Sequence, residues 1–418
     1  MKGWKTFKLK DVCTKIGSGA TPRGGKETYI TEGISLIRSQ NVLDFCFSDD
    51  GLAYISEEQA EQLSNVRVNA EDVLLNITGD SVARVCQAPE SILPARVNQH
   101  VGIIRPDPRK LCPGLLKYYL LSPSFKSFML GRASAGGTRN ALTKGMIENF
   151  EITVPEQLKE QKAIAKILSA FDDKIELNRR MNATLEAMAR ALFKAWFVDF
   201  EPVHANRENR PSTSASPEIA KLFPSDFENG IPKGWRLDKL ENVIELAYGK
   251  ALTAENRING EVPVYGSNGR VGFHSHALVE GPGIVVGRKG NPGTVIWVDE
   301  SFFPIDTTFY VKSDLELRFV FHSLENLDLA NLGGDSAVPG LSRSIAYRET
   351  FLSPPAELLE RFGEVCQPFT NKIFTNAKEN KLLMQIRDSL LPRLISGKLR
   401  AGEFDQGSAR KVRKSYGK

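Results

Sequence analysis

The side chains of this sequence that could do chemistry are the polar groups of its glycine-rich loops. Arginine can form paired hydrogen bonds with a guanine edge, asparagine or glutamine can do so with an adenine edge, and glycine lets a backbone approach DNA closely. These loops therefore form a candidate DNA-binding interface, although plain surface loops have a similar composition. The candidates in the N-terminal half are Ser18, Thr21, Arg23, Gln40, Asn41, Asn76, Thr78, Arg84, Asn98, Gln99, His100, Thr138, Arg139 and Asn140. Those in the C-terminal half are Tyr265, Ser267, Asn268, Arg270, Arg288, Lys289, Asn291, Thr307, Arg343 and Ser344.

The sequence patterns of common catalytic and metal sites are missing. The stretch GPGIVVGRKG from Gly281 is glycine-rich but lacks the Lys-Ser/Thr pair of a phosphate-binding loop. The sequence contains no GxSxG, no HExxH and no Asn-Pro-Pro-aromatic motif, and its five cysteines never form a CxxC pair. We therefore expect no catalytic residue, no metal site and no cofactor in this chain.

Composition and charge favour a chain of two or three globular domains. Of its 418 residues, 41% are hydrophobic and 25% are charged, which are ordinary proportions for such domains. No apolar run approaches the roughly 18 residues of a membrane span, and no secretory signal opens the chain, so we expect a cytoplasmic protein without membrane contact. The net charge of +5 arises between Lys398 and Lys418, so DNA binding by the body would depend on local basic patches.

The chain contains an internal repeat. GWKTFKLKDV from Gly3 is similar to GWRLDKLENV from Gly234, and FDDKIELNRRMNATLEAM from Phe171 is similar to FTNKIFTNAKENKLLMQI from Phe369. The two kinds of segment alternate along the chain. The chain therefore has two halves, and each half consists of an α+β domain followed by a helical segment.

Both helical segments carry an apolar stripe with helical periodicity, over residues 158–200 and 356–400. We expect the two long helices to pack as an antiparallel coiled coil, with a kink or break at Pro368 and at Pro392. Four asparagines fall on the stripes: Asn178, Asn182, Asn376 and Asn380. They would fix the register of the helix pair from its seam, or else they lie on a solvated flank.

These residues resemble a known family, the DNA specificity subunits of type I restriction–modification systems. The stretch EQKAIAKILSAFDDKIELNRRMNATLEAMARALFKAWFVDFEP from Glu160 is similar to the central conserved region of that family. Five further runs are similar to the recognition domains of that family: DVLLNITGDSVARVC, VNQHVGIIRP, YGSNGRVGF, GPGIVVGRKGNPGTV and PIDTTFYV. The tripeptide GKL at Gly397 is similar to the usual end of the family's sequences.

The resemblance implies a fold and a domain order. It predicts an α+β chain with two target-recognition domains, separated by two long helices packed as an antiparallel coiled coil, in a pseudo-two-fold repeat. The expected parts are residues 1–157 (first recognition domain), 158–200 (central helix), 201–232 (linker), 233–355 (second recognition domain), 356–400 (C-terminal helix) and 401–418 (basic disordered tail).

The resemblance also implies partners. The chain would be a non-catalytic subunit that reads one half of an asymmetric, bipartite double-stranded DNA target with each domain. It would bind two methyltransferase subunits and two motor–endonuclease subunits. S-adenosylmethionine, ATP and Mg would be used in those partners. The alternative is a stand-alone DNA-binding or adaptor protein whose helices mediate oligomerisation.

Overall fold

The computed structural model describes residues 3–134, 140–332 and 340–402. The chain divides into two compact units, Met1–Asn178 with Lys378–Lys418, and Arg179–Ala377. Each unit contains one α+β domain and part of both long helices. Residues 403–418 of the basic tail expected from the sequence lie outside the described residues.

Two four-stranded sheets form the α+β domain of the first unit. One has the order β2-β9-β6-β7 and is antiparallel throughout, and the other has the order β4-β3-β8-β5 with β3 parallel to β8. The strands are β2 (Cys13–Ser18), β3 (Ile34–Ile37), β4 (Ala53–Ile55), β5 (Arg67–Val68), β6 (Val73–Asn76), β7 (Val85–Gln87), β8 (Ala95–Val97) and β9 (Val101–Pro106). A separate ribbon pairs β1 (Trp4–Lys8) with β10 (Glu151–Pro155). The helices of this domain are α1 (Leu9–Val12), α2 (Glu57–Gln62), α3 (Pro113–Leu121), α4 (Pro123–Ser134) and α5 (Lys144–Glu148).

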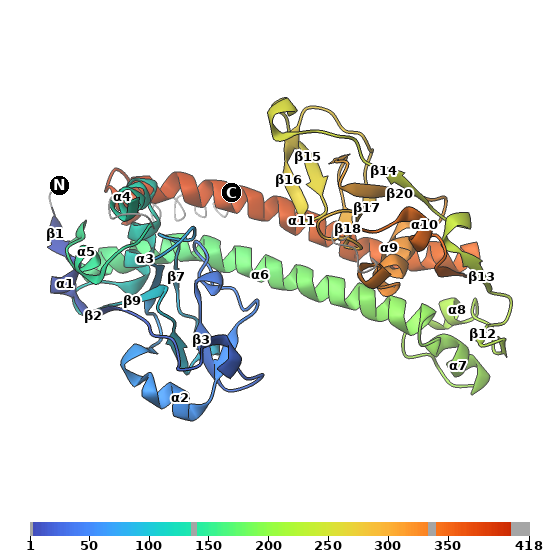
Figure 1. The fold of residues 1–418 in the computed structure, drawn as a ribbon, viewed down its shortest axis with the longest axis horizontal. Helices are drawn as coiled ribbons and strands as arrows, with labels where there is room; N and C mark the ends of the chain where they lie inside the picture. The colour runs from blue at the N-terminus through green and yellow to red at the C-terminus, as the bar shows by residue number, and fades with distance from the viewer. Residues whose placement is uncertain (1–2, 135–139, 333–339, 403–418) are drawn as a thin grey trace, which may run out of the picture. The chain divides into compact units, whose positions relative to one another are not determined.

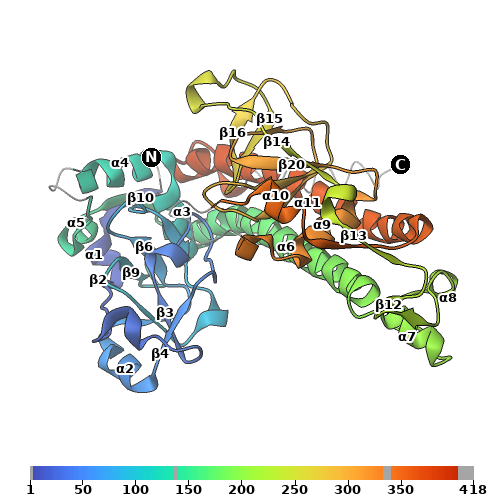
Figure 2. The same cartoon turned by 45° about the vertical axis from the view of Figure 1, so that its right-hand side comes forward.

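The domain of the second unit repeats this topology. Its antiparallel sheet has the order β14-β20-β17-β18, and a three-stranded sheet, β16-β15-β19, contains the parallel pair β15 and β19 (Figure 2). The strands are β13 (Arg236–Lys239), β14 (Glu245–Tyr248), β15 (Val262–Gly266), β16 (Gly269–His274), β17 (Gly283–Gly287), β18 (Val295–Val298), β19 (Phe303–Pro304), β20 (Thr308–Lys312) and β21 (Thr350–Ser353). The helices are α9 (Leu317–Asn326) and α10 (Arg343–Ala346). The expected α+β fold and internal repeat are thus confirmed.

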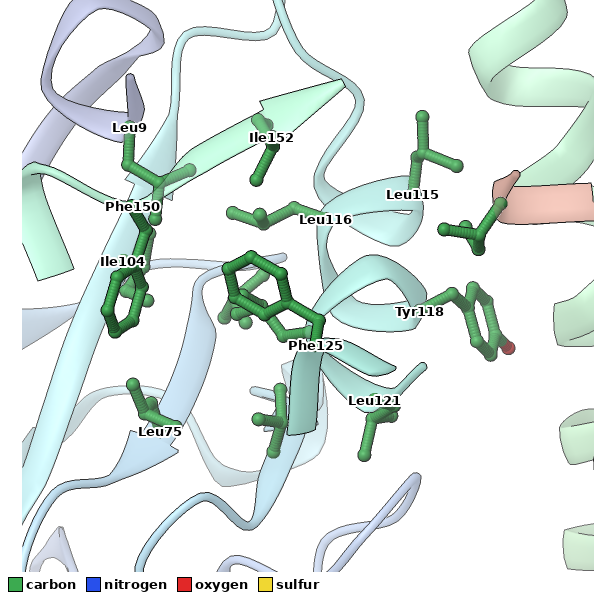
Figure 3. Close-up of a cluster of buried hydrophobic side chains, with 14 of the residues drawn as sticks. Leu9, Leu75, Ile104, Leu115, Leu116, Tyr118, Leu121, Phe125, Phe150 and Ile152 are labelled. Atoms are coloured by element: carbon green, nitrogen blue, oxygen red, sulfur yellow. The ribbon is translucent and has the colours of Figure 1, made fainter. Parts of the chain in front are cut away.

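The hydrophobic core of the first unit joins its antiparallel sheet to helices α3 and α4. Ile104 and Leu75 come from the sheet, and Leu116 and Phe125 come from the helices, all of them at most 9% exposed (Figure 3). Tyr118 lies at the edge of this cluster, with its hydroxyl directed away from it. The same core includes buried residues of both long helices.

The long helices are α6 (Leu158–Phe197) and α11 (Ala356–Ile395), each of 40 residues (Figure 1). In the first unit, Asp172 of α6 contacts Arg387 of α11, and the later Asn178 contacts the earlier Asn380. In the second unit, Asn182 contacts Asn376, and the later Phe193 contacts the earlier Phe362. In each unit the two helices therefore run antiparallel, as expected. α11 is one continuous helix through Pro368 and Pro392, so a break at either proline was wrong, and a kink there stays a prediction. Phe362 and Cys366 before the first proline, and Leu391 and Leu394 around the second, are buried in the cores, and this packing holds the helix together where a proline removes a backbone hydrogen bond.

The expected linker is a folded part of the second unit. It contains α7 (Glu201–Arg207), α8 (Pro217–Ala220) and a hairpin of β11 (Phe227–Glu228) and β12 (Ile231–Pro232). Val203, Ala205 and Phe223 are buried. The carboxylate of Glu201 accepts hydrogen bonds from the hydroxyls of Ser212 and Ser214 at 2.5 and 2.7 Å. The polar, proline-containing composition of residues 201–232 therefore gave no indication of these tertiary contacts.

Within the described part of the chain, no helix is both long and apolar enough to cross a membrane.

Candidate nucleic-acid interface

Loops of the first domain meet at one edge of its two sheets. Backbone hydrogen bonds join them: Ala20 N donates to Val97 O, Asn98 N to Ile37 O, Ile77 N to His100 O, and Gly79 N to Asn140 O. We call residues 18–23, 38–41, 77–84, 98–100 and 140 the first loop cluster. It brings together predicted site residues that lie more than 100 positions apart in the sequence, Ser18 and Asn140 among them.

The first loop cluster presents exposed polar side chains beside a small hydrogen-bonded network. The exposed members are Ser18, Thr21, Arg23, Gln40, Arg84, Gln99 and Asn140. Thr78 and His100 are half-buried, and Thr78 Oγ1 lies 2.7 Å from His100 Nδ1. Gln99 Nε2 lies 3.2 Å from His100 Nε2. Amide, hydroxyl, imidazole and guanidinium groups are therefore held within one surface.

Three predicted asparagines have structural roles instead. Asn41 and Asn76 are fully buried, and their amide nitrogens donate to backbone carbonyls, that of Asn41 to Ser48 and that of Asn76 to Ser39. Asn98 is 7% exposed, and its Oδ1 accepts from His100 N. Burial takes Asn41 and Asn76 off the surface that could meet DNA, and a base contact by Asn98 stays a prediction. Thr138 and Arg139 lie outside the described residues.

Loops of the second domain meet in the same way. Gly249 N donates to Thr308 O, Ile305 N to Tyr265 O, Arg288 N to Thr307 O, and Leu341 N to Arg288 O. We call residues 248–250, 266–270, 287–293, 305–307 and 340–344 the second loop cluster. Its exposed predicted residues are Asn268, Arg270, Lys289, Asn291 and Ser344, and its half-buried ones are Arg288, Thr307 and Arg343.

Two predicted residues of the second domain have other surroundings. Ser267 is 6% exposed, packed beneath Gly287 and Gly290. The ring of Tyr265 packs edge-on against Phe302, with 6.0 Å between ring centroids. Burial raises the pKa of the Tyr265 phenol. Burial takes Ser267 off the surface that could meet DNA, whereas Tyr265 is half-buried and its contact with a base stays a prediction.

Sequence reasoning missed Tyr248. It stands at the end of β14, is 47% exposed, and has the guanidinium carbons of Arg288 and Arg343 each 4.9 Å from its ring centroid. A single tyrosine after an apolar strand gives no sequence signal, because its importance depends on two arginines 40 and 95 residues further along.

The two loop clusters occupy corresponding places in the two domains. Gly19 and Gly249 each lie against the next loop so closely that a Cβ would be 2.1 Å from a backbone oxygen, that of Val97 and that of Ile305 respectively. Leu142 N donates to Ile77 O in one domain, as Leu341 N donates to Arg288 O in the other. The same backbone frame thus carries two different sets of side chains.

The four asparagines of the helix stripes form two pairs across the helices. Asn178 Nδ2 donates to Asn380 Oδ1 at 2.9 Å in the first unit, and Asn376 Nδ2 donates to Asn182 Oδ1 at 2.7 Å in the second. Three of them are at most 8% exposed and Asn182 is half-buried. In the repeat Asn178 corresponds to Asn376 and Asn182 to Asn380, so the partners exchange as they do in a two-fold symmetric interface.

Comparison with known proteins finds similarity to specificity subunits of type I restriction–modification systems. Residues 1–187 match the family model of the type I restriction modification DNA specificity domain. The type I restriction enzyme MjaIX specificity subunit of Methanocaldococcus jannaschii is 25% identical, over 96% of this chain and 95% of its own. The HindI specificity subunit of Haemophilus influenzae is also 25% identical, over 71% and 80%. The crystal structure of a type I S subunit from M. genitalium has the same fold, with a TM-score of 0.54 at 18% identity over 94% and 96% of the two chains.

Proposed function

The chain belongs to the HsdS-like specificity subunits of type I restriction–modification systems, and we propose that each loop cluster reads one half of a bipartite DNA target. The observation that carries this proposal is the repetition of one backbone frame with different polar side chains. Exposed Arg84 and Gln99 are base-reading types in the first cluster, and Asn268 and Lys289 are such types in the second. Because the two sets differ, the two half-sites should differ in sequence.

The chain acts as a non-catalytic member of a complex with other restriction–modification subunits. We propose two methyltransferase subunits and two motor–endonuclease subunits as its partners, since a two-fold repeated helix pair offers each kind of partner two related surfaces. S-adenosylmethionine, ATP and Mg would be bound by those partners. Among the residues that the structure describes, no three His, Cys, Asp or Glu side chains gather as a metal site requires.

The test is adenine methylation profiling of cells that contain the chain together with its methyltransferase subunit. The double variant Arg84→Ala/Gln99→Ala should relax one half-site, and Asn268→Ala/Lys289→Ala should relax the other. A loss of one base contact costs about 1–3 kcal/mol of discrimination, which is measurable as methylation at near-cognate sites. Glu61→Gln, an exposed change on α2, serves as the control. Relaxation of the same half-site by both double variants would contradict the proposal.

Co-purification distinguishes this function from the alternative. A specificity subunit should retain a tagged methyltransferase subunit through a salt wash. A stand-alone DNA-binding or adaptor protein should instead form oligomers of its own and leave that subunit in the flow-through.

A further inference from the structure

Tyr248 is the centre of an arginine cluster in the second loop cluster. The guanidinium groups of Arg288 and Arg343 both lie against its ring at 4.9 Å, within the range of a cation–π contact. The ring of Tyr248 also packs at a tilt on the fully buried Phe309, with 5.0 Å between the ring centroids, and the guanidinium of Arg288 lies 6.0 Å from the Phe309 ring. Tyr248 is therefore supported by the core and contacts two cations.

Both arginines are anchored at their backbones as well. Arg288 N donates to Thr307 O and Arg288 O accepts from Leu341 N, so the residue is held between two neighbouring loops. Arg288 Nη1 also donates to Asp306 O at 3.1 Å. Arg343 begins α10, and its guanidinium lies 5.8 Å from the ring of Tyr347, whose hydroxyl accepts from Leu246 N. Because a guanidinium has five N–H donors, these contacts still leave each arginine a pair of N–H groups for a ligand.

The fold does not require this cluster. At the places that correspond to Tyr248, Arg288 and Arg343, the first domain has Ser18, Ile77 and Lys144, as the equivalent hydrogen bonds of Gly19 and Leu142 show. The first domain closes the same edge without an aromatic ring or an arginine at these places. Two like charges held at one ring without a structural need point to an anionic or acceptor-rich ligand.

We propose that Tyr248 is a positioning residue that orients Arg288 and Arg343 to read guanine edges in the half-site of the second domain. This inference depends on the proposed function and adds a base preference to it. A guanidinium donates two parallel hydrogen bonds to the O6 and N7 atoms of guanine, which suits an arginine whose plane is already fixed by stacking. A phosphate can also accept two hydrogen bonds from one guanidinium, so the sequence dependence of binding is what distinguishes a guanine contact from a phosphate contact.

The experiment compares Tyr248→Phe with Tyr248→Leu in the full chain co-purified with its methyltransferase subunit. The probes are DNA duplexes that carry the wild-type target, found first by methylation profiling, with single base changes in either half-site. Tyr248→Phe keeps the ring and should retain wild-type discrimination. Tyr248→Leu should reduce discrimination at guanine positions of one half-site by at least about tenfold, with little change at the other half-site or in non-specific binding.

A second variant keeps the proposal testable if Tyr248→Leu does not fold. Arg343→Lys keeps the charge but loses the planar fork, so discrimination at guanine should fall while the salt dependence of binding stays the same. Arg236→Ala, an exposed arginine on β13, is the matched control and should change neither.

Several results would overturn the proposal. Tyr248→Leu with an unchanged profile would remove the positioning role. A uniform loss of affinity across all sequences would make the arginines phosphate contacts. Equal losses in Tyr248→Phe and Tyr248→Leu would make the hydroxyl itself the DNA contact. If the wild-type chain directs no bipartite methylation at all, the proposed function fails first, and this is distinguishable from a failure of Tyr248 alone.

Discussion

At the scale of the residue, Asp172 joins the first domain to both long helices within the first unit. Its carboxylate, on α6, accepts hydrogen bonds from Lys117 Nζ at 3.0 Å, Tyr118 hydroxyl at 2.5 Å and Arg387 Nη1 at 2.9 Å. Lys117 and Arg387 have only 7% of their side chains exposed. Burial, together with the charge of Asp172, raises the pKa of Tyr118, so this phenol stays protonated and donates.

We expect Asp172→Asn to destabilise the first unit by about 3 kcal/mol, because it leaves the buried Lys117 without a carboxylate and leaves the buried Arg387 with only the exposed Asp388, 2.8 Å away. Urea denaturation of the purified chain measures the loss. Asp173→Asn, an exposed neighbour on the same helix, should change the free energy of unfolding by no more than about 0.5 kcal/mol. An equal effect of the two substitutions would show that the network adds nothing beyond general charge.

Residue types indicated which loops present polar side chains, but they did not separate exposed side chains from buried ones. Arg84, Gln99, Lys289 and Asn268 lie exposed in the loop clusters. Asn41 and Asn76 have the same base-reading amide but are fully buried, because buried loop carbonyls need donors and an asparagine side chain supplies them. The sequence does not separate the two uses of the Asn76 amide, because the carbonyl that it bonds, that of Ser39, is 37 positions away in the chain and meets it only in the folded domain.

At the scale of the element, periodicity predicted both long helices, whereas composition did not show that residues 201–232 between them are folded. The apolar stripes depend on local spacing, which a sequence shows directly. Glu201 connects parts of residues 201–232, because it also accepts a hydrogen bond from Thr213 N at 3.1 Å and forms an ion pair with Arg210 at 2.9 Å. Such contacts have no periodic signature.

Glu201 predicts a pH dependence of stability. Burial alone would raise its pKa, but the hydrogen bonds from Ser212, Arg210, Thr213 and Ser214 together lower it below the usual value. A carboxyl group with a lowered folded pKa contributes stability above its unfolded pKa, about 4.3, and that stability is lost as the pH falls through the folded pKa.

We therefore expect Glu201→Gln to reduce the free energy of unfolding by about 1–3 kcal/mol at pH 7, and the difference from wild type to shrink below about pH 4. Thermal melts across this pH range measure it. Glu208→Gln is the matched control, because its carboxylate contacts the same Arg210 but is 58% exposed, so its effect should be at most about 0.5 kcal/mol. A constant difference across the pH range would argue against the role of the ionised Glu201.

At the scale of the whole molecule, the two asparagine pairs define how the helix pair can be altered. Each pair lies across α6 and α11, so an insertion in one helix alone would disrupt one pair. A matched insertion of four residues, after Asn178 in α6 and before Asn380 in α11, keeps both pairs and adds about one turn, or about 6 Å.

We expect this matched insertion to lengthen the gap between the half-sites by one or two base pairs, since each base-pair step is about 3.4 Å. Methylation profiling reads the gap directly. Both half-site sequences should stay the same, because the loop clusters are unchanged. A changed half-site sequence with an unchanged gap would mean that the helices do not set the spacing. The insertion in α6 alone should lower the yield of folded complex.

The described ends of the chain permit a further test of the repeat. The guanidinium of Arg400 lies 5.9 Å from the ring of Trp4, and Leu399 packs on the core of the first unit. Residues 3 and 402 can therefore be joined through a short connector. A new start is available at the exposed hairpin turn of Asn229 and Gly230, where no core side chain is cut from its neighbours.

We expect a circular permutant opened between Asn229 and Gly230 to fold, to bind the methyltransferase subunit and to keep the wild-type methylation profile. The reason is that both halves of the chain consist of an α+β domain followed by a long helix. A permutant opened between Thr213 and Ser214 should be less stable by about 1–3 kcal/mol, since Ser214 binds both Glu201 and, through its carbonyl, Trp196 Nε1. Urea denaturation and co-purification compare the two. If the hairpin permutant folds but recruits no methyltransferase subunit, the continuity of the helices with the original linker matters more than the repeat. If both permutants are equally stable, the folded linker contributes nothing to the second unit.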